Sequence, residues 1–390
     1  MSKKNIASHV SIIGGGGHIG LPLSCYIQNK GYKVLIVDNN IESINSIRKG
    51  NAPFFEEGLD KNLKNALKEG LVLTNEVSEI KFSEFVIVTI GTSSSKKSID
   101  LFDSLIKQVL KNITAEANLI LRSTVTEEDI SKIKNNIDYI NKNIKLTYCP
   151  ERIAEGEAFK ELINLPQIVG AENKENYKII NQFFKTLKID TLYTTIENAV
   201  FIKLFSNAYR HANFSITNEF YNIAFENNIN FSEIKNIATK KYPRLNKIPM
   251  TGYVGGPCLP KDLETFIKSY NVKNSLLNKL SYVNEKYLDN LVKLCAEVFE
   301  DKKIIQLGLT FKSGSDDLRG SGAIILNKKL QQYGFEVLPV DPHVNKSEID
   351  FSIFDYPEIQ HTTKNILIAV NHGEFNKYDL KNKTIVYGEL

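Results

Sequence analysis

The fold is decided near the N-terminus, where His9-Val10-Ser11-Ile12-Ile13 runs directly into Gly14-Gly15-Gly16-Gly17-His18-Ile19-Gly20. The first five residues predict a short apolar strand. Gly15, Gly17 and Gly20 form the pattern GxGxxG, residues 21–30 predict a helix, and residues 33–37 predict a second strand that ends on Asp38. A strand, a glycine-rich turn, a helix, a strand and an acid in this order are typical of a dinucleotide-binding βαβ unit.

The residue types in this unit indicate NAD. Glycines let the backbone approach a pyrophosphate at a helix N-terminus. A carboxylate after the second strand accepts hydrogen bonds from a ribose hydroxyl and repels a 2′-phosphate, which disfavours NADP. The alternative is a glycine-rich turn in another α/β fold. We predict that NAD is the cofactor, bound by Gly15, Gly17, His18, Ile19, Gly20 and Asp38.

Two later segments are expected at the same edge of the sheet. Further apolar strands are predicted at residues 85–90 and 118–121, with helical spacing between and after them. This alternation predicts a parallel sheet covered by helices on both faces, with ligands beyond the carboxyl ends of the strands. Thr92 and Thr124 follow these strands and are predicted to contact the cofactor, although such residues are equally common as helix N-caps.

Composition and length restrict the class of protein. The chain has 390 residues, enough for two or three domains, and its 42% hydrophobic and 24% charged residues are typical of soluble globular proteins. A net charge of +4 from 49 basic and 45 acidic side chains, without a dense basic block, argues against nucleic acid as a partner. No apolar run reaches the roughly 18 residues needed to span a membrane, and no signal peptide precedes the first strand, so we expect a cytoplasmic protein.

A second informative stretch is Gly255-Gly256-Pro257-Cys258-Leu259-Pro260-Lys261-Asp262. Glycines permit backbone turns that a side chain would forbid, and the prolines fix φ on both sides of the thiol. A lysine and backbone N–H groups near a cysteine favour the nucleophilic thiolate. The alternative for a lone cysteine is a structural role in a turn. The four cysteines are widely spaced without a CxxC pair, so we predict neither a disulfide framework nor a metal site.

Polar groups also stand out in the middle of the chain. The predicted strand at residues 146–149 is followed by Glu151 and Glu155, which would hold a polar substrate or order a water unless they are simply solvated. Residues 195–227 predict one long helix, on which Lys203 and Asn207 share a face that neighbouring Phe and Leu residues would bury.

The C-terminal part predicts a second, smaller doubly wound domain. Its strands are expected at residues 303–309, 336–341, 365–370 and 384–387, without a second GxGxxG pattern. Lys312 and Arg319 follow the first of these strands and would suit a phosphate.

Taken in order, these motifs resemble those of the UDP-glucose/GDP-mannose dehydrogenase family, and the resemblance covers nearly the whole chain. The N-terminal glycines and Asp38 look like the NAD site of that family. The other matching segments are Ser123-Thr124-Val125, Pro150-Glu151 with Glu155-Gly156, Lys203 with Asn207, the loop at residues 255–262, and Phe311-Lys312 with Asp317-Leu318-Arg319.

The resemblance implies an architecture. Two Rossmann-like doubly wound domains would be joined by a long central helix that forms the core of a homodimer. We expect an NAD-binding domain at residues 1–190, a helical dimerisation domain with the cysteine loop at residues 191–290, and a UDP-sugar-binding domain at residues 291–390. The sugar C6 would then lie in the cleft between Cys258 and NAD.

The resemblance also implies a reaction and its residues. A primary alcohol would be oxidised to a carboxylate with two NAD+, through a thioester on Cys258. Lys203 and Asn207 would stabilise the oxyanion and contact the sugar, and Glu155 would act as base through a water held with Thr124 and Asp262. The substrate contacts would further include Glu151, Arg244, Gly255 and Lys312, whereas Arg319 would reach the nucleotide or NAD.

Departures from the family pattern bear on the substrate. Thr89-Ile90-Gly91-Thr92-Ser93 replaces the V-P-T-P segment that often forms a cofactor wall, and Arg244 matches only approximately an arginine that reaches the neighbouring subunit's sugar. Pro150-Glu151-Arg152-Ile153 is similar to the UDP-N-acetylhexosamine branch, but Pro257 stands where that branch usually has histidine. We predict UDP-glucose as the substrate, with a UDP-N-acetylhexosamine as the alternative.

Two rival functions belong to other classes. A single-step NAD-dependent hydroxyacid dehydrogenase has broadly similar domains but needs no nucleophilic thiol. A non-catalytic nucleotide-binding protein could retain the fold, but the set of Cys258, Lys203 and Asn207 argues against it.

Overall fold

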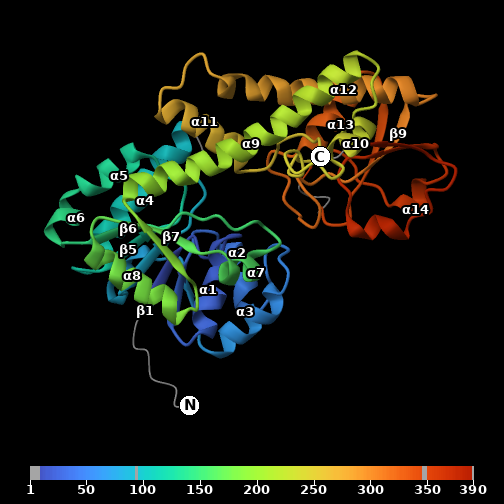
Figure 1. The fold of residues 1–390 in the computed structure, drawn as a ribbon. Coiled ribbons are helices and arrows are strands. Elements are labelled where there is room, and N and C mark those ends of the chain that lie inside the picture. Colours follow the sequence, from blue (N-terminus) through green and yellow to red (C-terminus); the bar gives the residue numbers. More distant parts are fainter. Residues whose placement is uncertain (1–8, 93–94, 345–348, 389–390) are drawn as a thin grey trace. The chain divides into compact units, whose positions relative to one another are not determined.

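The computed structural model describes residues 9–92, 95–344 and 349–388 of the chain (Figure 1). It is a mixed α/β structure with two sheets and a long helix between them in sequence, which confirms the predicted fold class. The chain divides into two units, residues 1–204 and 205–390. The division into three domains stays a prediction. Within the described ranges, no helix is both long enough and apolar enough to cross a bilayer.

The first unit is built on an eight-stranded sheet with the order β3-β2-β1-β4-β5-β6-β7-β8. The strands are β1 (His9–Ile13), β2 (Lys33–Val37), β3 (Val72–Thr74), β4 (Phe85–Val88), β5 (Asn118–Leu121), β6 (Lys145–Tyr148), β7 (Gln167–Ala171) and β8 (Thr191–Thr194). All neighbours pair in parallel except β6 and β7, which are antiparallel. An antiparallel neighbour starts at the edge where the previous strand ended, so β7 follows β6 without a crossover.

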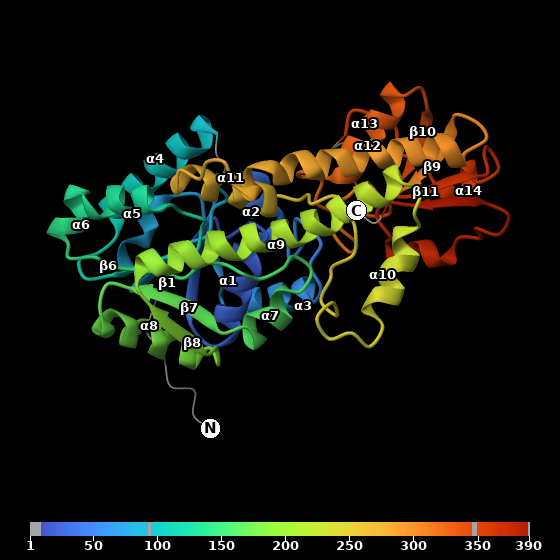
Figure 2. The same ribbon diagram turned by 45° about the horizontal axis from the view of Figure 1, so that its top comes forward.

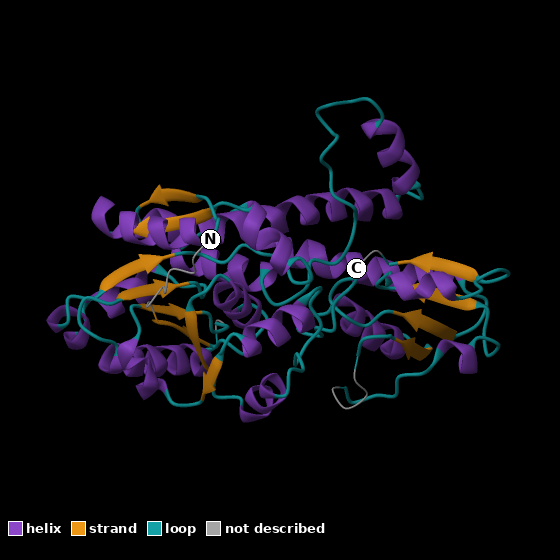
Figure 3. Ribbon diagram, turned by 90° about the horizontal axis from the view of Figure 1, so that it is seen from below, coloured by secondary structure: helices purple, strands orange, loops and turns teal. Residues whose placement is uncertain are grey.

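Helices alternate with most of these strands, as the spacing predicts, and Figure 3 shows them beside the strands. They are α1 (Gly20–Asn29), α2 (Ile41–Arg48), α3 (Leu59–Lys68), the 3-10 helix η1 (Val77–Phe82), α4 (Lys96–Asn112), α5 (Glu127–Lys134), α6 (Ile137–Asn141), α7 (Ala158–Asn164) and α8 (Lys174–Thr186). Their starts are set by local chemistry. At α5, for example, the Thr126 hydroxyl accepts the Asp129 N–H and the Asp129 carboxylate accepts the Thr126 N–H, which forms a capping box.

The strand register aligns the carboxyl ends of the central strands. Ile13 pairs with Val37 and with Val88, Val88 pairs with Leu121, and Leu121 pairs with Tyr148. The segments that follow these residues therefore start from one edge of the sheet. They include the glycine-rich turn and all the predicted cofactor contacts of the first unit.

Helix α9 (Ile196–Glu226) has 31 residues and runs from the first unit into the second, as predicted. Lys203 and Asn207 are buried on one face, as predicted, but part of the neighbouring aromatic residues is not. The side chains of Phe205, Tyr209 and Phe220 are exposed, whereas one stripe of polar side chains is buried. That stripe consists of Lys203, Asn207, His211, Ser215, Asn218 and Asn222.

The second unit combines helices with a four-stranded parallel sheet of order β10-β9-β11-β12. Its strands are β9 (Lys303–Leu307), β10 (Glu336–Val340), β11 (Asn365–Ile368) and β12 (Thr384–Tyr387). Its helices are α10 (Phe231–Thr239), α11 (Leu259–Ser269), η2 (Leu276–Lys279), α12 (Leu280–Val298), α13 (Gly322–Gln332), α14 (Tyr356–Ile359) and η4 (Gly373–Lys377).

Helix α12 lies beside the C-terminal half of α9 (Figure 2). Asn290 Nδ2 donates to Asn222 Oδ1 at 3.0 Å, and the rings of Tyr221 and Tyr287 meet edge to face at 5.0 Å. On its other side α12 packs on α13 and on the small sheet, in a cluster that includes Leu288 and Leu326. This packing joins the C-terminal half of α9 to the small sheet through α12.

Candidate active site

The glycine-rich turn follows β1 with no room for side chains on its inner side. Gly14 has φ +75°, and a Cβ on Gly20 would collide with the Gly14 carbonyl oxygen. A Cβ on Gly15 would come within 2.8 Å of Ile12 O. At Gly17, however, the nearest atom to such a Cβ is 3.6 Å away. A ligand can therefore approach the backbone at Gly17, and the turn fits a dinucleotide pyrophosphate.

Asp38 follows β2 and faces this turn. Its Oδ2 accepts the Gly16 N–H at 2.9 Å, and its Oδ1 accepts the Asn40 N–H at 3.0 Å. These bonds orient the carboxylate at the end of the strand, where a ribose hydroxyl would bind. His18 stacks on the Phe54 ring at 4.1 Å, and Ile19 directly precedes helix α1.

The segments after β4 and β5 are joined to each other. Thr92 Oγ1 donates to Thr124 O at 2.9 Å, and both residues are half-buried. The two threonines predicted to contact the cofactor therefore lie together. Ser93 and Ser94, which belong to the same predicted segment, lie outside the described residues.

A buried ion pair organises the loop after β6. Arg122 donates to Glu151 Oε2 from Nε at 3.1 Å and from Nη2 at 2.5 Å, and Nη1 donates to Gln167 Oε1 at 2.7 Å. Glu151 Oε1 accepts the backbone N–H groups of Arg152 and Ile153. Burial raises the pKa of Glu151, but the Arg122 charge and these hydrogen bonds outweigh it, so the net pKa lies below the ordinary value. Glu151 is therefore an ionised part of the loop framework.

The same loop receives Lys203. The buried Nζ of Lys203 donates to the carbonyl oxygen of Glu151 at 2.8 Å. Arg122 holds Glu151 and thereby fixes the loop on which the ammonium rests. Sequence reasoning did not single out Arg122 for this role.

Glu155 lies further along this loop, in a turn that another acid secures. Glu56 is buried, and its two carboxylate oxygens accept the N–H groups of Gly156 at 2.7 Å and Ala158 at 2.9 Å. Glu155 is half-buried beside that anchor. Glu56 carries no sequence signal, because it precedes the turn by 100 residues.

In the second unit, the cysteine stretch does not stay a loop throughout. Cys258 is exposed and is the N-cap of α11, which starts at Leu259 with Pro260 in its first turn. A helix N-terminus favours a negative charge, so this position favours the thiolate. Cys25, Cys149 and Cys295 are buried, and burial raises the pKa of each of these thiols to about 12.

Asp262 lies one turn into α11 and is fully buried. Its Oδ2 accepts Asn207 Nδ2 at 2.6 Å, and its Oδ1 lies 3.2 Å from Lys261 Nζ. The Asp262 N–H donates to Cys258 O at 2.8 Å. Asn207, Asp262 and Cys258 are therefore brought together, as the motif spacing alone could not show.

The glycines before Cys258 are required by a neighbouring loop. Gly256 has φ +80° and donates its N–H to Gly320 O at 3.0 Å. A Cβ on Gly255 would come within 2.5 Å of Gly320 O, and one on Gly256 within 2.6 Å of the Phe311 ring. The cysteine segment thus packs directly on the segment predicted to bind the nucleotide.

That second segment is itself stiffened by an acid. Asp317 is buried, and its carboxylate accepts Arg319 Nε and Nη2 at 2.9 and 2.5 Å. The guanidinium remains largely exposed. Lys312 is half-buried, with Nζ 5.7 Å from the centre of the Phe311 ring. Arg244 lies elsewhere in this unit, exposed over the Tyr242 ring, and is not drawn into the group.

The strand ends of the small sheet are tied by a buried histidine and acid. His372 Nε2 lies 3.3 Å from Asp341 Oδ2 and 3.1 Å from Thr310 Oγ1, and its Nδ1 accepts the Gly314 N–H at 3.3 Å. Asp341 Oδ2 also accepts the Leu309 N–H at 2.7 Å. Burial raises the pKa of Asp341, but His372 and the backbone N–H groups lower it further, below its ordinary value.

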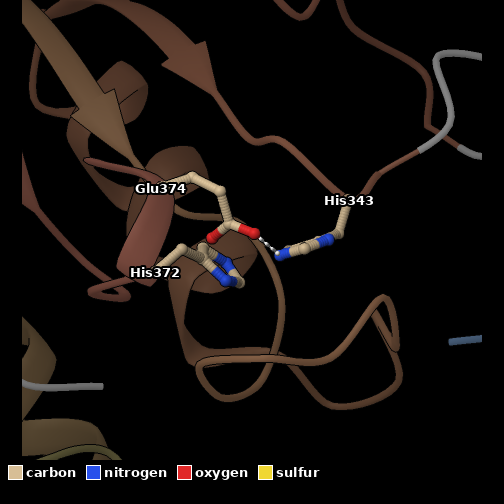
Figure 4. Close-up of side chains that lie close together, drawn as sticks. All are labelled: His343, His372 and Glu374. Atoms are coloured by element: carbon tan, nitrogen blue, oxygen red, sulfur yellow. Dashed lines mark ion pairs between the residues drawn. The ribbon is translucent and has the colours of Figure 1, made fainter. Parts of the chain in front are cut away.

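His343 and Glu374 extend this network outward (Figure 4). His343 Nε2 lies 3.2 Å from Glu374 Oε1, and its ring meets that of His372 edge to face at 4.8 Å. One nitrogen or oxygen from each of these three side chains lies within 4.8 Å of the others. Since both ring nitrogens of His372 are engaged, we interpret the group as a brace for the loop at residues 309–314.

Comparison with known proteins agrees with this arrangement over almost the whole chain. Residues 8–188 match the NAD-binding domain of the UDP-glucose/GDP-mannose dehydrogenase family, residues 197–286 its central domain, and residues 306–387 its UDP-binding domain. The cofactor expected from the glycine-rich turn is confirmed by the first of these matches.

Individual relatives carry different substrate names. A UDP-N-acetyl-D-mannosamine dehydrogenase of Methanococcus vannielii is 28% identical over 95% of this chain and 90% of its own length. A UDP-glucose 6-dehydrogenase of Rickettsia bellii is 28% identical over 84% of this chain and 80% of its own length. The solved structure of the UDP-D-ManNAc dehydrogenase from Pyrococcus horikoshii is 26% identical, with a TM-score of 0.85 over 97% of this chain and 93% of that one. The chain belongs to the UDP-glucose/GDP-mannose dehydrogenase family, the nucleotide-sugar dehydrogenases that use NAD.

Proposed function

We propose that this protein oxidises the C6 alcohol of a UDP-N-acetylhexosamine to the uronic acid, and that UDP-N-acetyl-D-mannosamine is its substrate. The reaction type rests on one observation: an exposed thiol begins the helix whose buried Asp262 binds Asn207. The substrate rests on the relatives named for that sugar and on the segment Pro150-Glu151-Arg152-Ile153. UDP-glucose, the first choice from the sequence, becomes the second candidate.

The thiol allows a four-electron oxidation within one site. Each NAD+ that binds would supply an acceptor for one hydride from C6, so two NAD+ would be consumed in the two successive oxidations. After the first, the Cys258 thiolate adds to the aldehyde carbon and the aldehyde oxygen takes a proton, which gives a thiohemiacetal. Loss of the second hydride and that proton leaves a thioester, and water then breaks its C–S bond to release the carboxylic acid and restore the thiol.

Lys203 and Asn207 would stabilise the oxygen at C6. An ammonium and a carboxamide both donate hydrogen bonds, and such donors matter most where negative charge develops. Both side chains are buried and held, Lys203 by the Glu151 carbonyl and Asn207 by Asp262. Lys203 would also take the alcohol proton in the first oxidation.

Hydrolysis of the thioester needs a base, and we assign it to Glu155. Both oxygens of Glu151 are engaged by Arg122 and by backbone N–H groups, which suits a framework role and a contact to the sugar. Glu155 would act through a water to which Thr124 and Asp262 contribute. Replacing Glu155 by Gln should make the thioester accumulate on Cys258, which intact-mass spectrometry would detect; accumulation only in Glu151→Gln would transfer the role to Glu151.

The nucleotide would bind to the segment at residues 311–320. Lys312 and Arg319 provide positive charge, and Gly255 provides backbone close to this segment. Arg319 could also contact NAD, and Arg244 would serve the sugar of a neighbouring subunit.

The deciding experiment measures NADH formed per sugar consumed. The purified protein is supplied with excess NAD+ and, separately, with UDP-N-acetylmannosamine, UDP-N-acetylglucosamine, UDP-N-acetylgalactosamine, UDP-glucose or GDP-mannose. Two NADH on the first sugar, with turnover lost in Cys258→Ser, is the expected result. A single NADH per sugar, or full turnover by Cys258→Ser, would instead support a one-step dehydrogenase, and NAD binding without turnover would support a binding protein.

We also propose that α9 pairs with its counterpart in a homodimer. Its exposed face carries apolar side chains that are costly to leave in water: Phe205, Tyr209, Ile216, Phe220 and Ile223. Light scattering at several concentrations tests this proposal, with Phe220→Glu as the variant expected to give monomers.

A further inference from the structure

Two buried asparagines hold the backbone just before the cysteine segment. Asn218 Nδ2 donates to Gly252 O at 2.7 Å, and Asn218 Oδ1 accepts the Gly252 N–H at 2.9 Å. Asn284 Nδ2 donates to Val254 O at 3.0 Å, and Asn284 Oδ1 accepts the Val254 N–H at 2.7 Å. Each carboxamide therefore pairs with both polar groups of one residue, as a neighbouring strand would.

This arrangement needs a carboxamide, not merely a polar side chain. A two-point contact requires one donor and one acceptor at the same end of a short side chain. An aspartate would lack the donor, and a leucine of similar size would lack both. Asn218 is 0% and Asn284 is 4% exposed, so neither can be serving mainly to contact water.

The two asparagines come from different helices, α9 and α12, and they bind Gly252 and Val254, which are two residues apart in sequence. The next part of the segment is held from a third side, because the Gly256 N–H donates to Gly320 O. Beyond it, Cys258 begins α11, which Asn207 ties back to α9 through Asp262. The thiol thus follows a short segment that is held at every second residue from 252 to 256.

We propose that Asn218 and Asn284 are positioning residues for the Cys258 thiol. They act through the backbone of Gly252 and Val254, and none of the catalytic or binding roles above falls on them. The inference rests on the proposed function in that Cys258 must be the nucleophile. A displacement of about 1 Å in a reacting group can cost about 100-fold in rate, so removing the hydrogen bonds of either asparagine should lower turnover measurably.

The chain offers a matched control in Asn290. It lies on α12 like Asn284 and is 1% exposed, but its Nδ2 donates to Asn222 Oδ1 at 3.0 Å instead of to the backbone before the cysteine segment. Asn284→Leu and Asn290→Leu each remove one buried carboxamide from the same helix. Asn284→Leu removes two hydrogen bonds to Val254 and Asn290→Leu removes one to Asn222, so Asn284→Leu should lose more thermal stability, and reactivity is therefore compared well below both melting temperatures.

The first measurement needs no substrate. Iodoacetamide modifies the exposed Cys258, while the other three cysteines are fully buried, and peptide mass spectrometry gives the rate. At pH 7 and well below the melting temperature, we expect Asn284→Leu and Asn218→Leu to react about five-fold more slowly than wild type, because a loosened thiol leaves the helix N-terminus that favours the thiolate. Asn290→Leu should react at the wild-type rate.

The second measurement is steady-state turnover with the sugar that wild type oxidises. We expect kcat to fall by about 100-fold in Asn284→Leu, with the KM for NAD+ unchanged because the predicted NAD contacts of the glycine-rich turn lie in residues 1–204. Asn284→Gln keeps the carboxamide and should recover part of kcat, and it replaces Asn284→Leu if that variant does not fold.

Equal behaviour of the Asn284 and Asn290 variants, in either measurement, would overturn the proposal and leave both as ordinary core residues. A failure of the proposed oxidation would appear separately, as wrong NADH stoichiometry in the wild type. The comparison of alkylation rates would still decide whether Asn218 and Asn284 position the thiol.

Discussion

The buried ion pair between Arg122 and Glu151 allows a test of what stabilises the first unit. In Arg122→Met the Glu151 carboxylate, whose side chain is 12% exposed, loses its counter-ion and two hydrogen bonds. Breaking a buried pair by removing one partner costs about 3–5 kcal/mol, because the remaining charge stays buried. Gln167 Oε1 loses its donor as well, which adds to the cost. We expect the free energy of unfolding of this unit to fall by about that amount.

The pH dependence distinguishes this mechanism from simple loss of packing. In the wild type the pKa of Glu151 lies below its ordinary value, so the ionised group contributes stability that is lost as the pH falls through the lowered value. In Arg122→Met burial acts without a counter-charge and raises that pKa above the unfolded value. The deficit should then be largest at neutral pH and shrink as the pH falls towards about 4.3.

Hydrogen exchange of the β5 and β6 amides, followed by mass spectrometry at pH 7 and pH 5, measures the effect within this unit. Lys132→Met is the control, since Lys132 pairs with Glu128 and Asp103 at the surface and such pairs contribute about 0–1 kcal/mol. Arg122→Met combined with Glu151→Gln should recover most of the loss. If Arg122→Met resembles the control, or if its deficit does not change with pH, the buried-charge reasoning is refuted.

Three further outcomes are expected. Replacing Asp38 by Ser should weaken NAD+ binding by about ten-fold or more, the worth of a hydrogen bond to a charged group, and improve NADP+ binding; titration calorimetry with both cofactors checks this. Gly20→Ala should abolish NAD+ binding in the same assay and lower the melting temperature, because its Cβ would collide with the Gly14 carbonyl oxygen. Burial lowers the pKa of His211 to about 4, so protonation favours the unfolded chain and stability should fall between pH 6.5 and pH 4 by up to about 3 kcal/mol. Urea unfolding of His211→Leu should show a flatter pH profile, and an unchanged profile would contradict the assignment.

Local sequence patterns predicted the main elements well. The βαβ unit, the central apolar strands and α9 appear where periodicity and turn residues placed them, within one or two residues. These elements combine strong hydrophobic patterning with glycine or polar residues at their ends, so local chemistry and global fold agree.

Two of the missed strands, β3 and β8, are stabilised mainly by their neighbours. β3 has three residues, and β8 exposes Leu192 and Tyr193 at the edge of the sheet. Neither is apolar and long enough to predict a strand by itself, and both form because an adjacent strand offers hydrogen bonds. The sequence analysis predicts no strand at β7 either, and its antiparallel direction depends on how the preceding loop returns, which no local pattern records.

The candidate site, like the fold, was predicted only in part from the sequence. Motif spacing located Cys258, Lys203 and Asn207, but it could not identify the residues that hold them. Glu56 acts on a turn 100 residues away, and Asn284 acts on a segment 30 residues earlier. Such partners are ordinary acids and amides in sequence, and only the fold brings them to their targets.

Helix α9 has one more consequence. Lys203 lies one residue before the end of the first unit and Asn207 near the start of the second, yet about one helical turn separates them, a rise of about 6 Å. Substitutions elsewhere in either unit can remodel its loops without altering this spacing. A single inserted residue between them, however, would rotate one group by about 100° relative to the other. The helix therefore fixes the spacing between the Lys203 and Asn207 backbone positions. Point substitutions elsewhere leave this spacing unchanged, whereas an insertion or deletion within the helix would change it.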